Sequence, residues 1–222
     1  ALFEKAMRLA KRRHAAEPFS AFVLSAPPLR LPALGVRMHR ELGIPWVLDL
    51  RDPWGTLTPR LKYAGAHEEA MLKSMEDESY RTAGAVTIVL PNMVDELLGA
   101  RPDLKDKVRL IYNGYDEQEF AGLRYEPGAS DEFTLYFGGT FREGPGVAEI
   151  ADGIAAALEG TRGLRDHLRF TITGKRKGAM PGMVNERGLQ DNVRVHAPIP
   201  NAEYVRRLAA SDVLFFYMPW AY

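Results

Sequence analysis

The sequence contains no cysteine, which excludes disulfide bonds, thiolate metal sites and a cysteine nucleophile. It also has no net charge, with 29 basic and 29 acidic residues, whereas a dedicated nucleic-acid binder usually has a basic excess. No apolar run approaches the roughly 18 residues that a membrane span needs. Disorder is excluded because 46% of the residues are hydrophobic. We therefore expect the 222 residues to form one large or two small globular domains.

The neutral total conceals an uneven distribution of charge. Residues 1–60 include ten basic and five acidic residues, residues 61–132 include eight and fifteen, and residues 133–222 include eleven and nine. Solvated helix faces account for such segments. The basic excess of the first segment also suggests, as an alternative, a peripheral contact with a membrane surface. The cations that suggest it are Lys11, Arg12, Arg13, Arg30, Arg37 and Arg40.

Strand-like and helix-like segments alternate along the chain, with one polar interruption. Apolar runs predict strands at 19–25, 44–50, 85–90, 108–112, 133–137, 168–172, 193–195 and from 213 onward. Helical periodicity predicts helices at 1–14, 31–42, 67–82, 92–98, 147–158, 183–188 and 202–210. We interpret residues 119–132 as a linker between two domains, 1–118 and 133–222. The alternation predicts an α/β fold of two parallel sheets with helices on both faces.

Three residues predict where helices begin or end. Gly43 is placed to terminate the helix before it, since glycine adopts the left-handed conformation without strain. Pro91 suits the first turn of the helix predicted at 92–98. Asn201 is predicted to cap the helix that follows it, through its side-chain oxygen.

In open parallel sheets ligands bind at the carboxyl ends of the strands, which directs attention to those positions. Arg51 and Asp52 follow the second apolar run and precede Trp54. One interpretation is an ion pair of Arg51 with Asp52 or Asp49 that orders the loop under the tryptophan. The other is a grip on a sugar or phosphate, because arginine can bind phosphate with two parallel hydrogen bonds. Spacing alone leaves both open.

Two strand ends in the second half have residues suited to an anion. Gly138, Gly139 and Thr140 lie between a strand and a helix, where glycine lets backbone amides approach a phosphate, and Arg142 follows. Lys175 begins a basic loop after Gly174, at the next strand end. A plain turn and a solvated loop would explain each alone. Because both ends belong to one sheet, we expect them to meet in one crevice suited to a diphosphate.

Metal and hydrolase chemistry have little support in the sequence. The five histidines are scattered without metal-ligand spacing, so we expect no metal site. Ser25 lacks the Gly-x-Ser-x-Gly frame of a hydrolase nucleophile.

With these residues described, the chain resembles bacterial GT-B glycosyltransferases of the GT4 type, in particular a capsule and exopolysaccharide subgroup. The resemblance rests on short motifs in a fixed order rather than on any one of them. They are SAPPL at 25–29, GIPWVLDLRDPW at 43–54, AGAVTIVLPNM at 83–93, KVRLIYNGYD at 107–116, FTLYFGGT at 133–140, GLQDNVRV at 188–195 and the segment 204–216.

The resemblance implies two Rossmann-like domains facing a cleft, the second holding a nucleotide-sugar donor and the first a saccharide, lipid-linked or small-molecule acceptor. It implies transfer with retention, without metal or other cofactor, and a cytoplasmic location at or near the inner membrane face. Arg51 stands where many relatives have a histidine near the transferred sugar, and Asp52 matches the next aspartate. Gly139 matches the glycine nearest the diphosphate. The family's arginine there is replaced by Thr140, so Arg142 or Lys175 is expected to substitute. Pro198 and Ile199 match the loop that packs on the base.

The resemblance also implies that both ends of the fold are incomplete here. The family's Glu-x7-Glu segment would follow Tyr222, and the first strand of the first domain would precede Ala1, so we expect the chain alone to be poorly active. Two other functions stay open. One is a nucleotide-sugar 2-epimerase of the same architecture, and the other is a non-catalytic subunit that binds nucleotide-sugars or depends on a partner.

Overall fold

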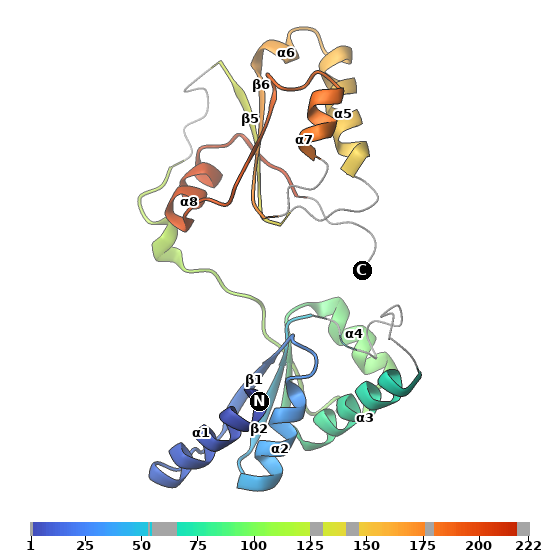
Figure 1. The fold of residues 1–222 in the computed structure, drawn as a ribbon, viewed down its shortest axis with the longest axis vertical. Coiled ribbons are helices and arrows are strands. Elements are labelled where there is room, and N and C mark those ends of the chain that lie inside the picture. The colour runs from blue at the N-terminus through green and yellow to red at the C-terminus, as the bar shows by residue number, and fades with distance from the viewer. Residues whose placement is uncertain are drawn as a thin grey trace. The chain divides into compact units, whose positions relative to one another are not determined.

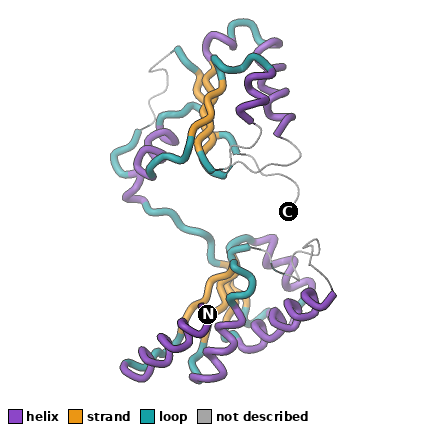
Figure 2. Tube along the Cα trace, in the orientation of Figure 1, coloured by secondary structure: helices purple, strands orange, loops and turns teal. Residues whose placement is uncertain are grey.

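The computed structural model describes residues 2–52, 54, 66–124, 131–140, 147–175 and 180–216. The chain divides into two compact units, Ala1–Gly114 and Tyr115–Tyr222. Each unit contains one four-stranded parallel sheet with helices packed against it (Figure 2). The division after Gly114 lies close to the predicted end of the first domain at residue 118. None of the described helices is long and apolar enough to cross a bilayer.

The first unit alternates helices and strands from α1 onward (Figure 1). Its elements are α1 (Leu2–Ala16), β1 (Phe22–Ala26), α2 (Pro32–Leu42), β2 (Trp46–Leu50), α3 (Ala66–Thr82), β3 (Ala85–Ile88), α4 (Pro91–Ala100), η2 (Pro102–Leu104) and β4 (Val108–Leu110). All four predicted strands are present. The predicted helix ends at Gly43 and Pro91 are confirmed, because Gly43 adopts φ 70° and Pro91 opens α4.

The core of the first unit lies on one face of its sheet. The strand order is β1-β2-β3-β4, and Leu24, Leu48, Val86 and Val108 are aligned across it and buried. They form one cluster with buried residues of α1, α2, α3 and α4. The successive strands are added in one direction, and right-handed crossovers then place every helix on the same side. In its described part this unit thus departs from the expectation of helices on both faces.

The carboxyl end of α3 is held by a lysine from another part of the chain. The Nζ atom of Lys107, just before β4, donates to the carbonyl oxygens of Tyr80 at 3.1 Å, Arg81 at 3.0 Å and Ala83 at 2.9 Å. The last carbonyls of a helix lack partners within the helix, and a cation there is favourable. Lys107 therefore joins α3 to the start of β4.

We expect Lys107→Met to lower the free energy of unfolding of the first unit by about 2 kcal/mol, because three carbonyls lose a charged donor. Lys105→Met is the matched control, since Lys105 is exposed, and it should change stability by less than about 0.5 kcal/mol. Urea unfolding followed by tryptophan fluorescence reports mostly on this unit, whose core includes Trp46 and Trp54, two of the three tryptophans in the sequence. Equal effects of the two substitutions would contradict the capping role.

The second unit has the reversed strand order of a doubly wound sheet. Its elements are η3 (Glu117–Phe120), β5 (Phe133–Gly138), α5 (Val147–Gly160), α6 (Leu164–His167), β6 (Leu168–Thr173), α7 (Met180–Glu186), β7 (Val193–His196), α8 (Asn201–Ala209) and β8 (Val213–Leu214). The order β7-β6-β5-β8 means that the chain first extends the sheet on one side of β5 and then crosses to the other. The predicted strands of this half are all present.

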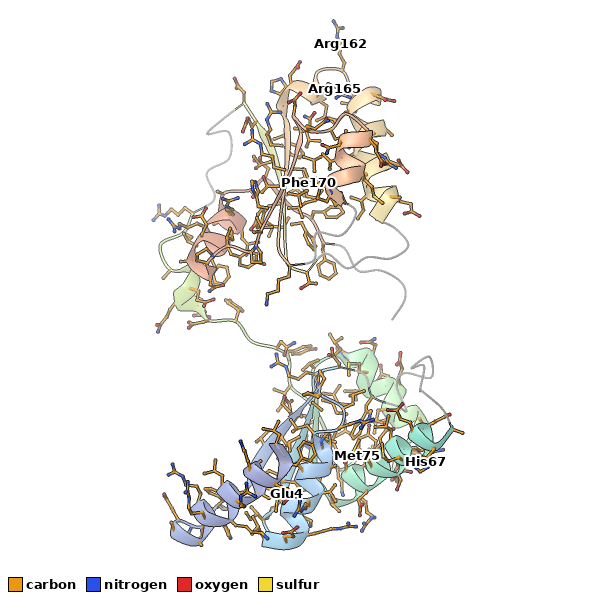
Figure 3. All side chains as sticks on the ribbon, in the orientation of Figure 1. Glu4, His67, Met75, Arg162, Arg165 and Phe170 are labelled. Carbon is orange, nitrogen blue, oxygen red and sulfur yellow. The ribbon has the colours of Figure 1, made fainter. Side chains whose placement is uncertain are left out.

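This reversal distributes the helices over both faces of the second sheet. Helices α5 and α7 contact each other on one side of β5 and β6, and α8 packs on the other side against β5 (Figure 1). Phe170, labelled at the centre of the unit in Figure 3, belongs to β6. Its side chain is buried against the α5–α7 layer in a cluster with Leu158, Ile172 and Val184. Such a sheet has a topological switch point beside β5, where ligands bind in this class of fold.

Candidate functional site

A hollow of about 420 Å³ lies at the switch point of the second sheet. It is lined by residues from the carboxyl ends of β5, β6 and β7 and from the first turn of α8. The lining residues are Gly138, Gly139, Thr140, Thr173, Gly174, Lys175, Pro198, Ile199, Asn201 and Tyr204. The two strand ends predicted to converge on one crevice therefore lie together. We refer to this hollow as the switch-point pocket.

Two glycine loops are packed against each other at the floor of the switch-point pocket. The Gly139 amide donates to the Thr173 carbonyl at 2.9 Å, which joins the loop after β5 to the end of β6. A β-carbon on Gly174 would overlap the carbonyl oxygen of Gly139. Gly174 thus has to be glycine for the two loops to approach this closely.

The glycines have packing roles that the sequence did not predict. A β-carbon on Gly138 would overlap the ring of Tyr204, so this glycine makes room for an aromatic ring. The Gly139 amide is already engaged with Thr173. Among the described residues, the amides of Thr140 and Lys175 donate to no acceptor, and both residues are exposed. These two residues are therefore the better candidates to meet an anion.

Tyr204 provides an aromatic wall that sequence reasoning did not single out as a site residue. Its ring centroid lies 6.1 Å from that of Tyr136, at an interplanar angle of 47°. Partial burial, and secondarily the neighbouring Tyr136, raises the pKa of Tyr204 above its usual value. One signal in the sequence could have identified Tyr204: it is an aromatic residue in the first turn of the helix that follows the strand predicted at 193–195.

The predicted cap at Asn201 is wrong. Pro200 occupies the position before α8, with no side-chain cap, and Asn201 is the first helical residue. Its side-chain amide donates to Glu119 Oε1 at 2.8 Å and so joins α8 to η3. The physical reason is that Pro200 already has the extended conformation that the capping position requires, which moves Asn201 into the helix.

The remaining predicted donor-site residues divide into those the structure describes and one it does not. Lys175, Pro198 and Ile199 line the pocket, with Ile199 half-buried. Arg142 lies outside the described residues. Whether these residues bind a diphosphate or a base stays a prediction.

Arg51 and Asp52 belong to the first unit and lie at the carboxyl end of β2, where both are exposed. The Arg51 guanidinium donates to Asn113 Oδ1 at 3.0 Å, and its backbone amide donates to the Ala26 carbonyl. In the described part of the chain Arg51 forms no ion pair with Asp52 or Asp49. Asp49 instead accepts hydrogen bonds from the hydroxyls of Ser25 and Thr87 on the neighbouring strands. The ion-pair interpretation of this cluster is therefore wrong: Asp49 is aligned with Ser25 and Thr87 on the same face of the sheet, and its carboxylate accepts from their hydroxyls instead.

A larger hollow of about 850 Å³ lies beside α3 and η2 in the first unit, but its charges are largely paired. Arg101 binds Asp77 and Asp103 and lies over the Tyr80 ring, while Arg81 binds Glu78. Where the structure describes the chain, it contains no group of His, Asp and Glu side chains that could hold a metal ion. The switch-point pocket is therefore the stronger candidate site.

No family model and no curated protein matches the sequence, but many solved structures match the fold. The catalytic domain of starch synthase IV from Arabidopsis thaliana, bound to ADP and acarbose, has 12% identity and a TM-score of 0.58 over 96% of this chain and 54% of its own. The UDP-GlcNAc 2-epimerase from Neisseria meningitidis, bound to UDP-GlcNAc, has 16% identity and a TM-score of 0.54 over 96% and 58%. The N-terminal domain of trehalose-6-phosphate phosphatase from Candida albicans has 10% identity and a TM-score of 0.66 over 96% and 53%.

These likenesses establish the fold. The chain consists of two Rossmann-like α/β units of the kind found together in GT-B proteins such as starch synthase. It spans a little more than half the length of these three structures. The expected α/β fold class is thereby confirmed, while the GT4 type and its capsule subgroup stay predictions.

Proposed function

We propose that the second unit binds the nucleoside diphosphate of a nucleotide-sugar, and that the chain is part of a retaining glycosyltransferase of glycan or polysaccharide biosynthesis. The observation that carries this proposal is the switch-point pocket, in which two glycine loops, Lys175 and an aromatic wall surround one hollow. Two of the structural neighbours have ADP or UDP-GlcNAc bound, which supports the same chemistry.

The pocket offers separate surroundings for the two parts of such a ligand. Lys175 and the amides of Thr140 and Lys175 suit the diphosphate, since charge-assisted hydrogen bonds to phosphate are strong. Pro198, Ile199 and Tyr204 offer an apolar wall for the base. In sugar transfer, negative charge develops on the departing diphosphate, and cations and amides placed there lower the barrier. Arg51 and Asp52 are proposed to act at the transferred sugar, with Asn113 positioning the guanidinium.

A 2-epimerase is the second candidate, favoured by the likeness to UDP-GlcNAc 2-epimerases. Epimerisation removes and returns a proton at carbon, which calls for carboxylate or histidine bases. Incubating the complete protein with UDP-GlcNAc and no acceptor distinguishes them: an epimerised sugar identifies an epimerase. Binding without either reaction would indicate a partner-dependent subunit.

Isothermal titration of the complete protein with UDP, ADP, GDP and dTDP tests the donor site. We expect heat with at least one nucleotide and about tenfold weaker binding for Lys175→Gln, the effect of losing one charge-assisted contact. Arg162→Gln is the control, because Arg162 projects away from the second unit (Figure 3). The absence of heat with every nucleotide, or equal weakening by the two variants, would reject the proposed site.

A further inference from the structure

Helix α1 has an outer face that combines cations with exposed leucines. Leu2, Lys5, Leu9, Arg12 and Ala16 follow the three-and-four spacing of one helix face, and all are exposed. Leu2 is 74% exposed and Leu9 is 49% exposed. We define the outer face of α1 as these five residues together with the adjacent, exposed Arg13. It contains three cations and no acidic side chain.

The opposite side of α1 faces α2 through a network of ion pairs. Glu4 binds Arg37 at 2.5 Å, Arg37 binds Glu41 at 2.6 Å, and Glu41 binds Lys11 at 2.5 Å. Hydrogen bonds from Arg37 and Lys11 lower the pKa values of Glu4 and Glu41, respectively, so both stay ionised at neutral pH. Glu4 is labelled at this seam in Figure 3. This seam of ion pairs joins α1 to α2 and engages Lys11, whereas Lys5, Arg12 and Arg13 form no ion pair with any residue that the structure describes.

The structure also corrects which cations are available to an external partner. Of the six basic residues that suggested a membrane contact, four form ion pairs with acidic side chains. These pairs are Lys11 with Glu41, Arg30 with Glu68, Arg37 with Glu4 and Glu41, and Arg40 with Glu78. The other two, Arg12 and Arg13, lie on the outer face of α1, which also includes Lys5.

We propose that the outer face of α1 binds the surface of a bilayer containing anionic lipid. A helix lying in the headgroup region inserts apolar side chains between cations that contact lipid phosphates, and this face presents both. Leucines at positions 2 and 9 are spaced by about two turns, so both can enter the same plane. A nucleic acid would match the cations but would leave these leucines without a favourable environment. This proposal is independent of the nucleotide site.

Co-sedimentation of the chain with lipid vesicles tests the proposal. Binding should be strong with vesicles of phosphatidylcholine plus phosphatidylglycerol, weak with phosphatidylcholine alone, and reduced by high salt. The variant Lys5→Gln/Arg12→Gln/Arg13→Gln should lower the partition coefficient about a hundredfold, on the basis of about fivefold per cation near an anionic surface. The control Lys105→Gln/Arg162→Gln/Arg194→Gln removes the same charge from other exposed positions and should leave binding unchanged.

A second variant separates lipid insertion from simple attraction to negative charge. Leu2→Ser/Leu9→Ser keeps every charge, and we expect it to weaken vesicle binding at least about tenfold. Circular dichroism checks that the exposed substitutions leave the helix content unchanged. The proposal would be overturned if the leucine variant bound vesicles as the parent does, or if the triple control variant lost as much binding as the Lys5/Arg12/Arg13 variant. It would also be overturned if the chain bound duplex DNA but not anionic vesicles.

Discussion

Replacing Gly174 with alanine is expected to destabilise the second unit by at least about 3 kcal/mol and to abolish nucleotide binding. The new methyl group would overlap the carbonyl oxygen of Gly139, a backbone atom that no side-chain rotation can move away. Overpacking of this kind costs about 1 to 3 kcal/mol even where side chains can adjust. Separating the two loops would also break the hydrogen bond from the Gly139 amide to Thr173.

Gly153→Ala is the matched control for this experiment. Gly153 lies within α5 of the same unit, and a β-carbon there would meet nothing within 4 Å. Alanine in a helix interior is favoured over glycine by about 1 kcal/mol, so this variant should be slightly more stable than the parent. Thermal unfolding by circular dichroism, with hydrogen exchange of the β5 and β6 amides, measures both variants. A Gly174→Ala protein with parental exchange rates would contradict the packing derived for the two loops.

Replacing Trp46 with alanine is expected to lower the stability of the first unit by about 4 kcal/mol. Trp46 begins β2 and is 1% exposed, and its ring stacks on Phe22 with centroids 5.8 Å apart. A β-carbon on Gly35 would lie 2.6 Å from this ring, so α2 packs directly against the indole. Removing a large buried aromatic side chain leaves a cavity and costs about 3 to 5 kcal/mol.

Trp46→Phe tests whether the lost volume is the cause. The Nε1 atom of Trp46 is buried and has no hydrogen-bond partner among the described residues. Phenylalanine keeps an aromatic ring and removes this unsatisfied group, so we expect a loss of less than about 1.5 kcal/mol. Urea unfolding followed by far-ultraviolet circular dichroism avoids reliance on the fluorescence of the replaced residue. Equal losses of stability in Trp46→Ala and Trp46→Phe would show that the cavity is not the main cause of the destabilisation.

The positions of the strands could be predicted because they depend on local pattern. Each apolar run bounded by glycine, proline or polar residues became a strand, even the short β4 and β8. Gly43 and Pro91 fulfilled their predicted roles, since left-handed backbone and a missing amide hydrogen act on the immediate neighbours. Asn201 failed because the capping position depends on a competing neighbour, Pro200.

The residues of the candidate site were predictable in part. Gly138, Gly139, Thr140 and Lys175 were found because ligands gather at strand ends, a rule that needs only the strand boundaries. Tyr204 and the packing role of Gly138 were missed. They depend on how a helix lies against a strand more than sixty residues earlier in the sequence, and no local pattern records that contact.

By itself, then, the sequence determined the class of fold, the number of strands and the strand ends that matter, because hydrophobic period and turn residues act over a few neighbouring positions. Only the tertiary structure decided the strand orders, the helix-covered faces and the partners of the cations. Strand order depends on the direction of each crossover, and it placed the switch point beside β5. Ion pairing depends on the rotation of one helix against another, and it left Arg12 and Arg13 outward while Arg37 was held in the seam of α1 and α2.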